Sequence, residues 1–496
     1  MCVYGGSIRL DSLHQTEAKE VEILKYLDHY NDQWIQSEDI ARKLSYGKAT
    51  VQKNVRNIQS RLKELSIDGI SLESSPSKGI LFSRYPEVSL HRVIENIYKH
   101  SFNFSLINSI FHETISSLHL FSIDHYFSIA SVKRAISVLN KILRKSNICI
   151  KLNQFVGDEY SIRSFLFKYY WEIFKGMSWP FKSIDKEKII SFLNHFNEES
   201  GLFHTIISQE QICYFFAVSR IRWLKGHAVT FDKEIHDFAS SHSRYDEFEK
   251  LWQLHFPFNQ LPLEEKHYCF YILYSFSFDV GRLSEDRVNE VCKIFSESTT
   301  VSTYLTLSVI QRFSSFFSIK ISPTDKIDLV MLHHKAHLLR CTNCLAPSSG
   351  YLSELKNDFP YFCDVIYHQT ELFLGVNSDV IFDKNIILEG YTLFLYDIID
   401  FGVFAKEVKV AIMFSGGSLN EKKLAKQLQI KYSDKMIFDF VSSNEEHDVL
   451  ITDTPMFLDS SKKRIYIEGT FLSDIDYQFL EETFDELENQ PLFVTK

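Results

Sequence analysis

The 496-residue sequence predicts a multidomain, mainly α-helical protein with tandem winged helix-turn-helix units at its start and an α/β domain at its end. Three observations predict this fold class. Two segments each join a short helix, a turn, a longer basic helix and a hairpin; the middle of the chain shows helix after helix; and residues 403–496 alternate strands with helices. The predicted domains are the winged units at 1–85 and 86–163, two helical bundles at 164–260 and 261–402, and the α/β domain at 403–496.

The composition is that of a globular protein, with 45% hydrophobic and 24% charged residues. The net charge of −10 opposes nucleic-acid binding by the whole molecule, so contact with DNA requires a segregated basic region. The eight cysteines are scattered, the first residues lack a signal-peptide pattern, and no stretch approaches the roughly 18 apolar residues of a membrane span. We therefore expect a cytoplasmic protein without membrane contact.

The first basic unit opens with a helix over 15–29 and a short helix for which Ser37 is the expected N-cap. After a turn at 45–47, residues 48–65 have apolar side chains at helical spacing, with Arg61 and Lys63 on the outer face. Residues 69–82 follow as a wing hairpin. The expected DNA contacts are Lys48, Thr50 and Gln52 at base edges, and Lys53, Arg56 and Lys78 at phosphates.

The second basic unit has a short apolar helix around Phe121, a break at 128–131, and a longer helix with basic but no acidic residues. Ile148, Ile150 and Leu152 then alternate with polar residues up to a turn at 157–158, which predicts a strand and hairpin. The expected DNA contacts are Ser131, Lys133 and Arg134 at base edges and Lys141 at phosphates. An ordinary helical hairpin with a solvated basic face has the same pattern, but two such units in an acidic chain favour DNA binding.

From 164 to about 400 the chain is predicted to form two bundles of about 110 residues. Segments 209–227 and 324–341 share a polar start, an apolar run and a basic residue one turn later, which indicates a duplicated module. In the last domain, a buried strand at 408–414 leads through Ser415-Gly416-Gly417-Ser418 into a helix. Further strands at 436–441, 448–452 and 463–467 predict an open parallel sheet, with a glycine loop where such a fold binds an anion.

The tandem winged units, the segment GDEYSIR at 157–163 and the two bundles in series resemble the Mga/AtxA family of virulence transcription regulators. This resemblance implies that the bundles are PTS-regulation domains, which the sugar phosphotransferase system phosphorylates on histidine. By position, the candidate histidines are His195, His204, His227, His333, His334, His337 and His368. A phosphate-accepting histidine needs an exposed imidazole and a neighbour that fixes its tautomer; among the candidates, we favour His204 and His334.

The last domain resembles the enzyme IIB components of the same system, whose phosphate-carrying cysteine lies in the loop after the first strand. This chain has Ser415 in that loop and no cysteine after Cys363. Since serine is a poor nucleophile without a strong base beside it, we expect a retained fold for oligomer contacts or ligand sensing. Cys341 and Cys344 form a lone CxxC, so no metal site and no cofactor are expected.

The resulting hypothesis is a dimeric, non-enzymatic DNA-binding regulator that activates virulence or metabolic genes and responds to histidine phosphorylation or metabolic state. Its expected partners are double-stranded DNA, a second copy and carrier proteins of the phosphotransferase system. A phosphoryl-transfer component of that system is one alternative, although the 414–418 loop lacks a Cys or His nucleophile. An RNA-binding antiterminator is another, although such proteins begin with a β-rich module and this chain begins with helices.

Overall fold

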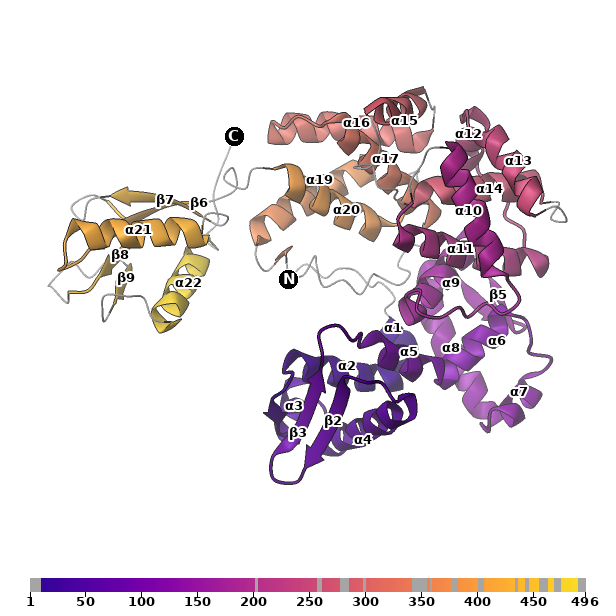
Figure 1. The fold of residues 1–496 in the computed structure, drawn as a ribbon, viewed down its shortest axis with the longest axis horizontal. Coiled ribbons are helices and arrows are strands. Elements are labelled where there is room, and N and C mark those ends of the chain that lie inside the picture. Colours follow the sequence, from indigo (N-terminus) through magenta and orange to yellow (C-terminus); the bar gives the residue numbers. More distant parts are fainter. Residues whose placement is uncertain are drawn as a thin grey trace. The chain divides into compact units, whose positions relative to one another are not determined.

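The computed structural model describes residues 10–200, 204–256, 261–276, 285–297, 300–340, 355–356, 359–376, 382–399, 406–432, 436–441, 446–454, 463–467 and 474–488. Figure 1 shows the helices and strands of the chain, which divides into two compact units. The first contains residues 1–349 and 372–390, and the second contains residues 350–371 and 391–496.

A winged helix-turn-helix opens the first unit. Its elements are α1 (Leu10–Leu13), α2 (Gln15–His29), β1 (Trp34–Ile35), α3 (Ser37–Lys43), α4 (Lys48–Leu65), β2 (Ile70–Ser75) and β3 (Gly79–Arg84). The strands form an antiparallel sheet in the order β1-β3-β2. Val51, Val55 and Ile58 of α4 are buried, as the spacing predicts. The expectation for Ser37 was wrong: Gln36 is the N-cap, and Ser37 is already the first helical residue.

The second helix-turn-helix follows after two linking helices. The elements are α5 (His91–Lys99), α6 (Phe102–Phe111), α7 (Leu118–Asp124), α8 (Ile129–Leu143), the 3-10 turn η1 (Arg144–Ser146), β4 (Cys149–Lys151) and β5 (Gln154–Val156). Two αL residues, Ser45 and Tyr126, stand in the turns before α4 and α8, with φ of 57° and 58°. The two units thus repeat one arrangement of short helix, left-handed turn and longer helix.

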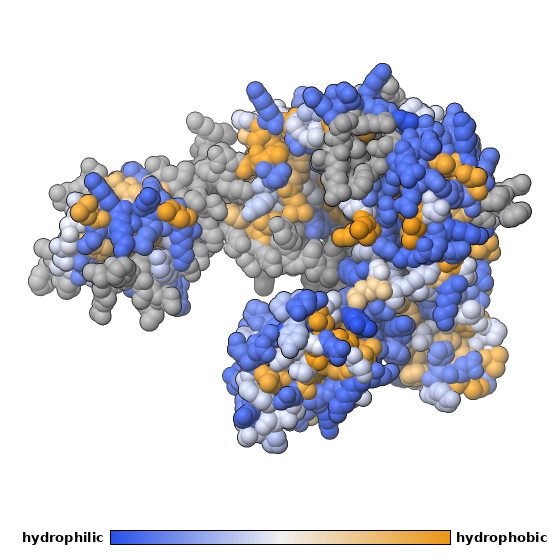
Figure 2. Space-filling model, in the orientation of Figure 1, coloured by the Kyte–Doolittle hydropathy of each residue, from blue (hydrophilic) through white to orange (hydrophobic). Residues whose placement is uncertain are grey.

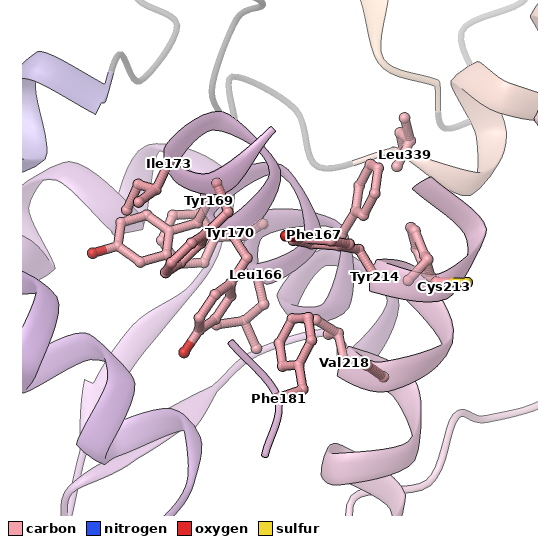
Figure 3. Packing of buried hydrophobic residues seen from close by; sticks show 14 of the residues in the cluster. Leu166, Phe167, Tyr169, Tyr170, Ile173, Phe181, Cys213, Tyr214, Val218 and Leu339 are labelled. Carbon is pink, nitrogen blue, oxygen red and sulfur yellow. The ribbon is translucent and has the colours of Figure 1, made fainter. Parts of the chain in front are cut away.

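Helix α9 (Glu159–Phe174) is the central element of the first unit. It begins five residues before the predicted bundle boundary at 163/164, because the Asp158 side chain accepts a hydrogen bond from the Ser161 amide and caps it. Figure 3 shows Leu166, Phe167 and Tyr170 of α9 among the aromatic and aliphatic side chains of α11 and of the segment that follows α9. Helix α9 also reaches the winged units, because the Tyr170 hydroxyl donates to Asn108 Oδ1 in α6 at 2.6 Å.

The rest of the first unit is helical. The helices are α10 (Lys186–Ser200), α11 (Ile206–Leu224), α12 (Lys233–Ser241), α13 (Tyr245–His255), α14 (Leu263–Ser275), α15 (Glu285–Glu297), α16 (Val301–Phe317) and α17 (Pro323–Leu338). Helix α14 packs against α11, α12 and α17, and all of these helices belong to the first compact unit. Two more helices, α19 (Pro360–Val376) and α20 (Lys384–Ile398), each contribute residues to both units. The five predicted domains stay a prediction.

The second unit contains an α/β domain with a four-stranded sheet. Its elements are β6 (Lys406–Met413), α21 (Ser418–Tyr432), β7 (Met436–Val441), β8 (Val449–Thr452), β9 (Lys463–Tyr466) and α22 (Asp474–Glu488). All neighbouring strands are parallel, in the order β7-β6-β8-β9, which confirms the predicted open parallel sheet. Val410, Ile451 and Leu428 belong to its core.

None of the helices in the described part of the chain has both the length and the apolarity needed to cross a membrane. Hydrophilic residues dominate the visible face, with hydrophobic ones scattered among them (Figure 2).

Candidate nucleic-acid interface

The polar face of α4 is accessible to solvent in the first winged unit. Lys48, Gln52, Lys53 and Arg56 are exposed, and Thr50 is half-buried. These residues occupy the first turns of the longer helix, which is the part of a recognition helix that contacts base edges. The structure therefore brings these predicted contacts together on one helix, while their contact with DNA stays a prediction.

Two cations of this unit have weak partners. Lys48 forms an ion pair with Glu38 of α3, and the Lys78 ammonium on the wing lies 5.6 Å from the centre of the Trp34 ring. Exposed pairs of this kind contribute little to stability, so both cations can exchange their partners for phosphates.

Arg61 was wrongly placed on the open face of α4. Its Nε lies 3.1 Å from a carboxylate oxygen of Glu20 in α2, and its Nη1 donates to the Asn96 side chain in α5 at 3.0 Å. Arg61 therefore joins α4 to two neighbouring helices. The sequence spacing alone does not distinguish such a cation from a solvated one.

Helix α8 presents the second basic face. Lys133, Arg134 and Lys141 are exposed, while Val132 and Leu139 are buried below them. Ser131 is half-buried and shares a hydrogen bond of 2.8 Å with Ser128, the N-cap of α8. The segment 129–157 contains no Asp or Glu and has six basic residues, which are Lys133, Arg134, Lys141, Arg144, Lys145 and Lys151.

The wing of the second unit is shorter than predicted. Strands β4 and β5 pair with Ile150 opposite Phe155, and the chain reverses at Leu152 and Asn153. The predicted turn at 157–158 is wrong, since Asp158 caps α9 instead. Leu152, which the alternation placed with Ile150 on the apolar face, is 95% exposed because it lies in the turn itself.

The wing is attached to α8 by one asparagine. The Asn140 side chain donates to the Ile150 carbonyl at 3.0 Å and accepts from the Ile150 amide at 2.6 Å. Phe155 on the opposite strand is buried against the core. These contacts hold the wing in a fixed position relative to the basic face of α8.

A charged network begins at the other end of the wing. Glu113, in the loop after α6, accepts hydrogen bonds from Gln154 of β5 at 3.0 Å and from the His227 ring at 2.5 Å. A guanidinium nitrogen of Arg222, in α11, lies 3.9 Å away. Glu113 thus joins the wing to the end of α11.

Helix α9 extends this network into the bundle. Arg222 donates twice to the Glu159 carboxylate, at 3.0 and 2.6 Å, and Glu159 also accepts from Arg163 Nε at 3.0 Å. The two donor nitrogens at the end of Arg163 reach both oxygens of Glu265 in α14. Sequence reasoning noted Glu159 and Arg163 within the segment 157–163 but gave no sign of their partners, which lie far away along the chain.

The favoured phosphorylation candidates are both buried. His204 is 2% exposed and hydrogen-bonds Asn197 and the Leu273 carbonyl, and burial lowers its pKa to about 4. His334 packs between the rings of Phe238 and Tyr271, and burial holds its pKa well below the ordinary value. Neither has the exposed imidazole on which the prediction depends.

The other candidates differ in accessibility. His333 and His337 are buried, with His333 bonded to Thr306 and His337 next to Asp232 and Arg340. His227 is bonded to Glu113, as described above.

His195 and His368 are exposed. The His195 ring has a neighbour that can fix its tautomer, because its Nδ1 lies 2.8 Å from Nε2 of His255. This arrangement leaves the other nitrogen of His195 available for a new bond. His195 therefore meets both requirements for a phosphate-accepting histidine.

The glycine loop of the second unit is closed by an acidic side chain. The Ser415 amide and hydroxyl both donate to the Asp453 carboxylate, at 2.8 and 2.6 Å, and these bonds lower the pKa of Asp453. The expectation that Ser415 is not a nucleophile stays a prediction. Among the described residues, no three His, Cys, Asp or Glu side chains are grouped to hold a metal ion; Cys341 and Cys344 lie outside those residues.

Comparison with known proteins identifies the second winged unit. Residues 86–170 match the model of the Mga helix-turn-helix domain. A protein described as a trans-acting regulator, from Streptococcus pneumoniae serotype 4, is 23% identical over 228 residues, which are 45% of each chain. The capsule synthesis positive regulator AcpB of Bacillus anthracis is 18% identical over 239 residues, 47% of this chain and 48% of that protein.

The aligned regions thus span about half the length of each relative. The matched domain and both relatives agree with the resemblance drawn from the residues. Residues 86–170 therefore form an Mga-type helix-turn-helix domain, in a chain that is similar over about half its length to two proteins described as regulators.

Proposed function

We propose that this protein is a transcription regulator that binds double-stranded DNA through α4 and α8. The observation that carries the proposal is the exposed basic face of α8, within a segment of six cations and no acidic residue in a chain of net charge −10. Cations gathered on one recognition helix neutralise phosphates and release counterions, which overcomes repulsion from the acidic remainder. The name of AcpB favours positive regulation as the direction of the effect.

The bundle is proposed to influence DNA binding through the network from Gln154 to Glu265. Because Glu113 contacts both the wing and α11, a change in the bundle moves the wing together with α8, to which Asn140 fixes it. Phosphorylation of His195 by carrier proteins of the phosphotransferase system is the proposed input, since its ring is exposed and oriented by His255. A homodimer is the proposed binding form, because two linked sites strengthen modest single-site affinity.

The test is a salt titration of DNA binding by the full chain. Replacing the exposed cations Lys141 and Arg144 by alanine should weaken binding and reduce the slope of log K against log salt by about one for each lost phosphate contact. Lys182→Ala with Lys188→Ala, which removes two exposed cations of the bundle, is the matched control and should leave the slope unchanged. Equal slopes for the two double variants would refute the role of α8.

The chain is tested whole because a fragment ending at residue 163 would cut α9. The removed part of α9 includes Tyr169, whose hydroxyl hydrogen-bonds His14 of the first winged unit at 3.0 Å. A phosphoryl-transfer component is not favoured, since Ser415 is the loop residue and Asp453 engages it.

A further inference from the structure

Two hydrophobic side chains of the second winged unit are almost completely exposed. Tyr126 is 96% exposed and Leu152 is 95% exposed, more than any other large hydrophobic side chain among the described residues. Tyr126 lies in the turn before α8 and Leu152 at the tip of the wing. The two residues therefore lie on either side of the basic recognition helix in the sequence.

Leu152 is also held in an unfavourable backbone conformation. It has φ of 48° and is followed by Asn153 with φ of 63°, so both central residues of this two-residue turn are left-handed. Such turns favour Asn, Asp or Gly, because a side chain with a full Cβ crowds the following carbonyl in this region. Asn153 satisfies that preference and Leu152 does not. Neither backbone geometry nor burial of the side chain accounts for a leucine at this position.

The tip has a fixed direction and a basic neighbour. Asn140 bonds both backbone groups of Ile150, and Gln154 is bonded to Glu113, so both strands of the wing are attached. Lys151, directly before Leu152, is exposed. A lone aliphatic side chain between Lys151 and Asn153 does not form the contiguous apolar patch that a protein partner requires.

We propose that Leu152 is a DNA-bending wedge. With α8 in the major groove, the wing tip lies over the adjacent minor groove, where Leu152 enters between two base pairs and partly unstacks them. Apolar side chains used in this way kink DNA by roughly 20–90°. Lys151 contacts a neighbouring phosphate. This inference rests on the proposed function and adds its mode of recognition: pyrimidine–purine steps, which unstack most easily, are preferred at the wedge position.

The test compares the parent chain with Leu152→Asn. Asparagine suits the left-handed turn, so this variant should unfold at the same or a higher urea concentration while lacking the wedge. The probe is a set of end-labelled duplexes enriched from random sequence by binding to the full parent chain, and bending is measured by energy transfer between the two ends. Tyr126→Phe is the second variant, because it keeps the aromatic ring in the turn and the wing intact.

The parent chain and Tyr126→Phe should bend the enriched duplexes, whereas Leu152→Asn should bind them with little bending and with an unchanged salt slope. A preference for TA or CA steps should also disappear from duplexes enriched by Leu152→Asn. Equal bending by the parent and Leu152→Asn would overturn the wedge and leave DNA binding intact. Failure of the parent chain to enrich any duplex would overturn the proposed function, and the wedge with it.

Discussion

Arg163 and Glu265 form a two-point ion pair inside the first unit, with nitrogen–oxygen distances of 2.8 and 2.7 Å and side-chain exposures of 0% and 2%. Arg163 stands in the first turns of α9 and Glu265 in the first turn of α14. Glu265 also accepts a hydrogen bond from the Val229 amide, and Arg163 donates to the His227 carbonyl. The pair therefore fixes α9, α14 and the segment after α11 together.

Removal of one partner of this pair should be strongly destabilising. Arg163→Met leaves the Glu265 carboxylate buried without its cation, which costs about 3–5 kcal/mol of unfolding free energy. The measurement is urea unfolding followed by circular dichroism. The double variant Arg163→Met with Glu265→Gln is the control and should recover part of the loss, since no uncompensated charge remains at Glu265. A single variant as stable as the parent would show that the pair is not formed.

The two carboxylates that face Arg222 should differ in importance. Glu159→Gln takes away the closely bonded partner of a guanidinium that is 1% exposed, so we expect a loss of about 3 kcal/mol. Glu113→Gln removes the charge of a carboxylate whose oxygen lies 3.9 Å from a guanidinium nitrogen of Arg222, and it leaves the Glu159 pair in place. We therefore expect a loss of about 1 kcal/mol of unfolding free energy. Urea unfolding of both variants under one set of conditions gives the ranking. The reverse order would mean that Glu113 is the main counter-ion of Arg222.

Elements that depend on neighbouring residues were predicted from the sequence, whereas contacts between residues far apart along the chain were not. The bounds of α4 follow from local signals, namely its apolar stripe and the turn at 45–47, and the structure gives the same range, Lys48–Leu65. The parallel sheet followed equally from short apolar strands separated by helices. The contacts of Arg61 and the burial of the favoured histidines were not predicted, because their environment is made by distant residues, such as Glu20 for Arg61 and Leu273 for His204.

Leu152 shows a different limit of local patterns. Apolar and polar residues alternate from Ile148 through Leu152. This alternation does not show that the strand ends before Leu152. Turn prediction depends on Gly, Asn or Asp, so Asn153 alone between Leu152 and Gln154 was a weaker signal than Gly157-Asp158. Leu152, which does not fit the residue preference of its left-handed turn, is also the residue that we propose as the DNA-bending wedge.

Buried histidines should make the fold sensitive to acid. His14 is completely buried, bonded to the Tyr169 hydroxyl and the Ser101 hydroxyl, and burial lowers its pKa to about 3. The unfolded chain takes up this proton below its ordinary pKa of about 6.5, whereas the folded chain does so only near 3. The stability contributed by neutral His14 is therefore fully present above pH 6.5 and is lost as the pH falls from 6.5 towards 3.

Between pH 7 and pH 5 this single histidine accounts for about 2 kcal/mol of lost unfolding free energy. His14→Gln should therefore be less stable than the parent at pH 7 but lose about 2 kcal/mol less between the two pH values. Urea unfolding at both pH values measures the difference. His29→Gln, which removes an exposed histidine of the same winged unit, is measured alongside as the control for the loss of a histidine. An unchanged pH dependence in His14→Gln would show that His14 is accessible to protons in the folded chain.

Phosphorylation should distinguish the exposed His195 from the buried His204 and His334. When the full chain is incubated with a phosphorylated histidine carrier protein of the phosphotransferase system, His195→Ala should lose most of the transferred radiolabel. The imidazole of His195 is exposed, whereas those of His204 and His334 are enclosed and have lowered pKa values. His204→Gln and His334→Gln should therefore keep the label, and His255→Gln should reduce it by leaving the His195 tautomer unfixed. Full labelling of His195→Ala with loss of label in His204→Gln would mean that the bundle opens to expose His204 before it reacts.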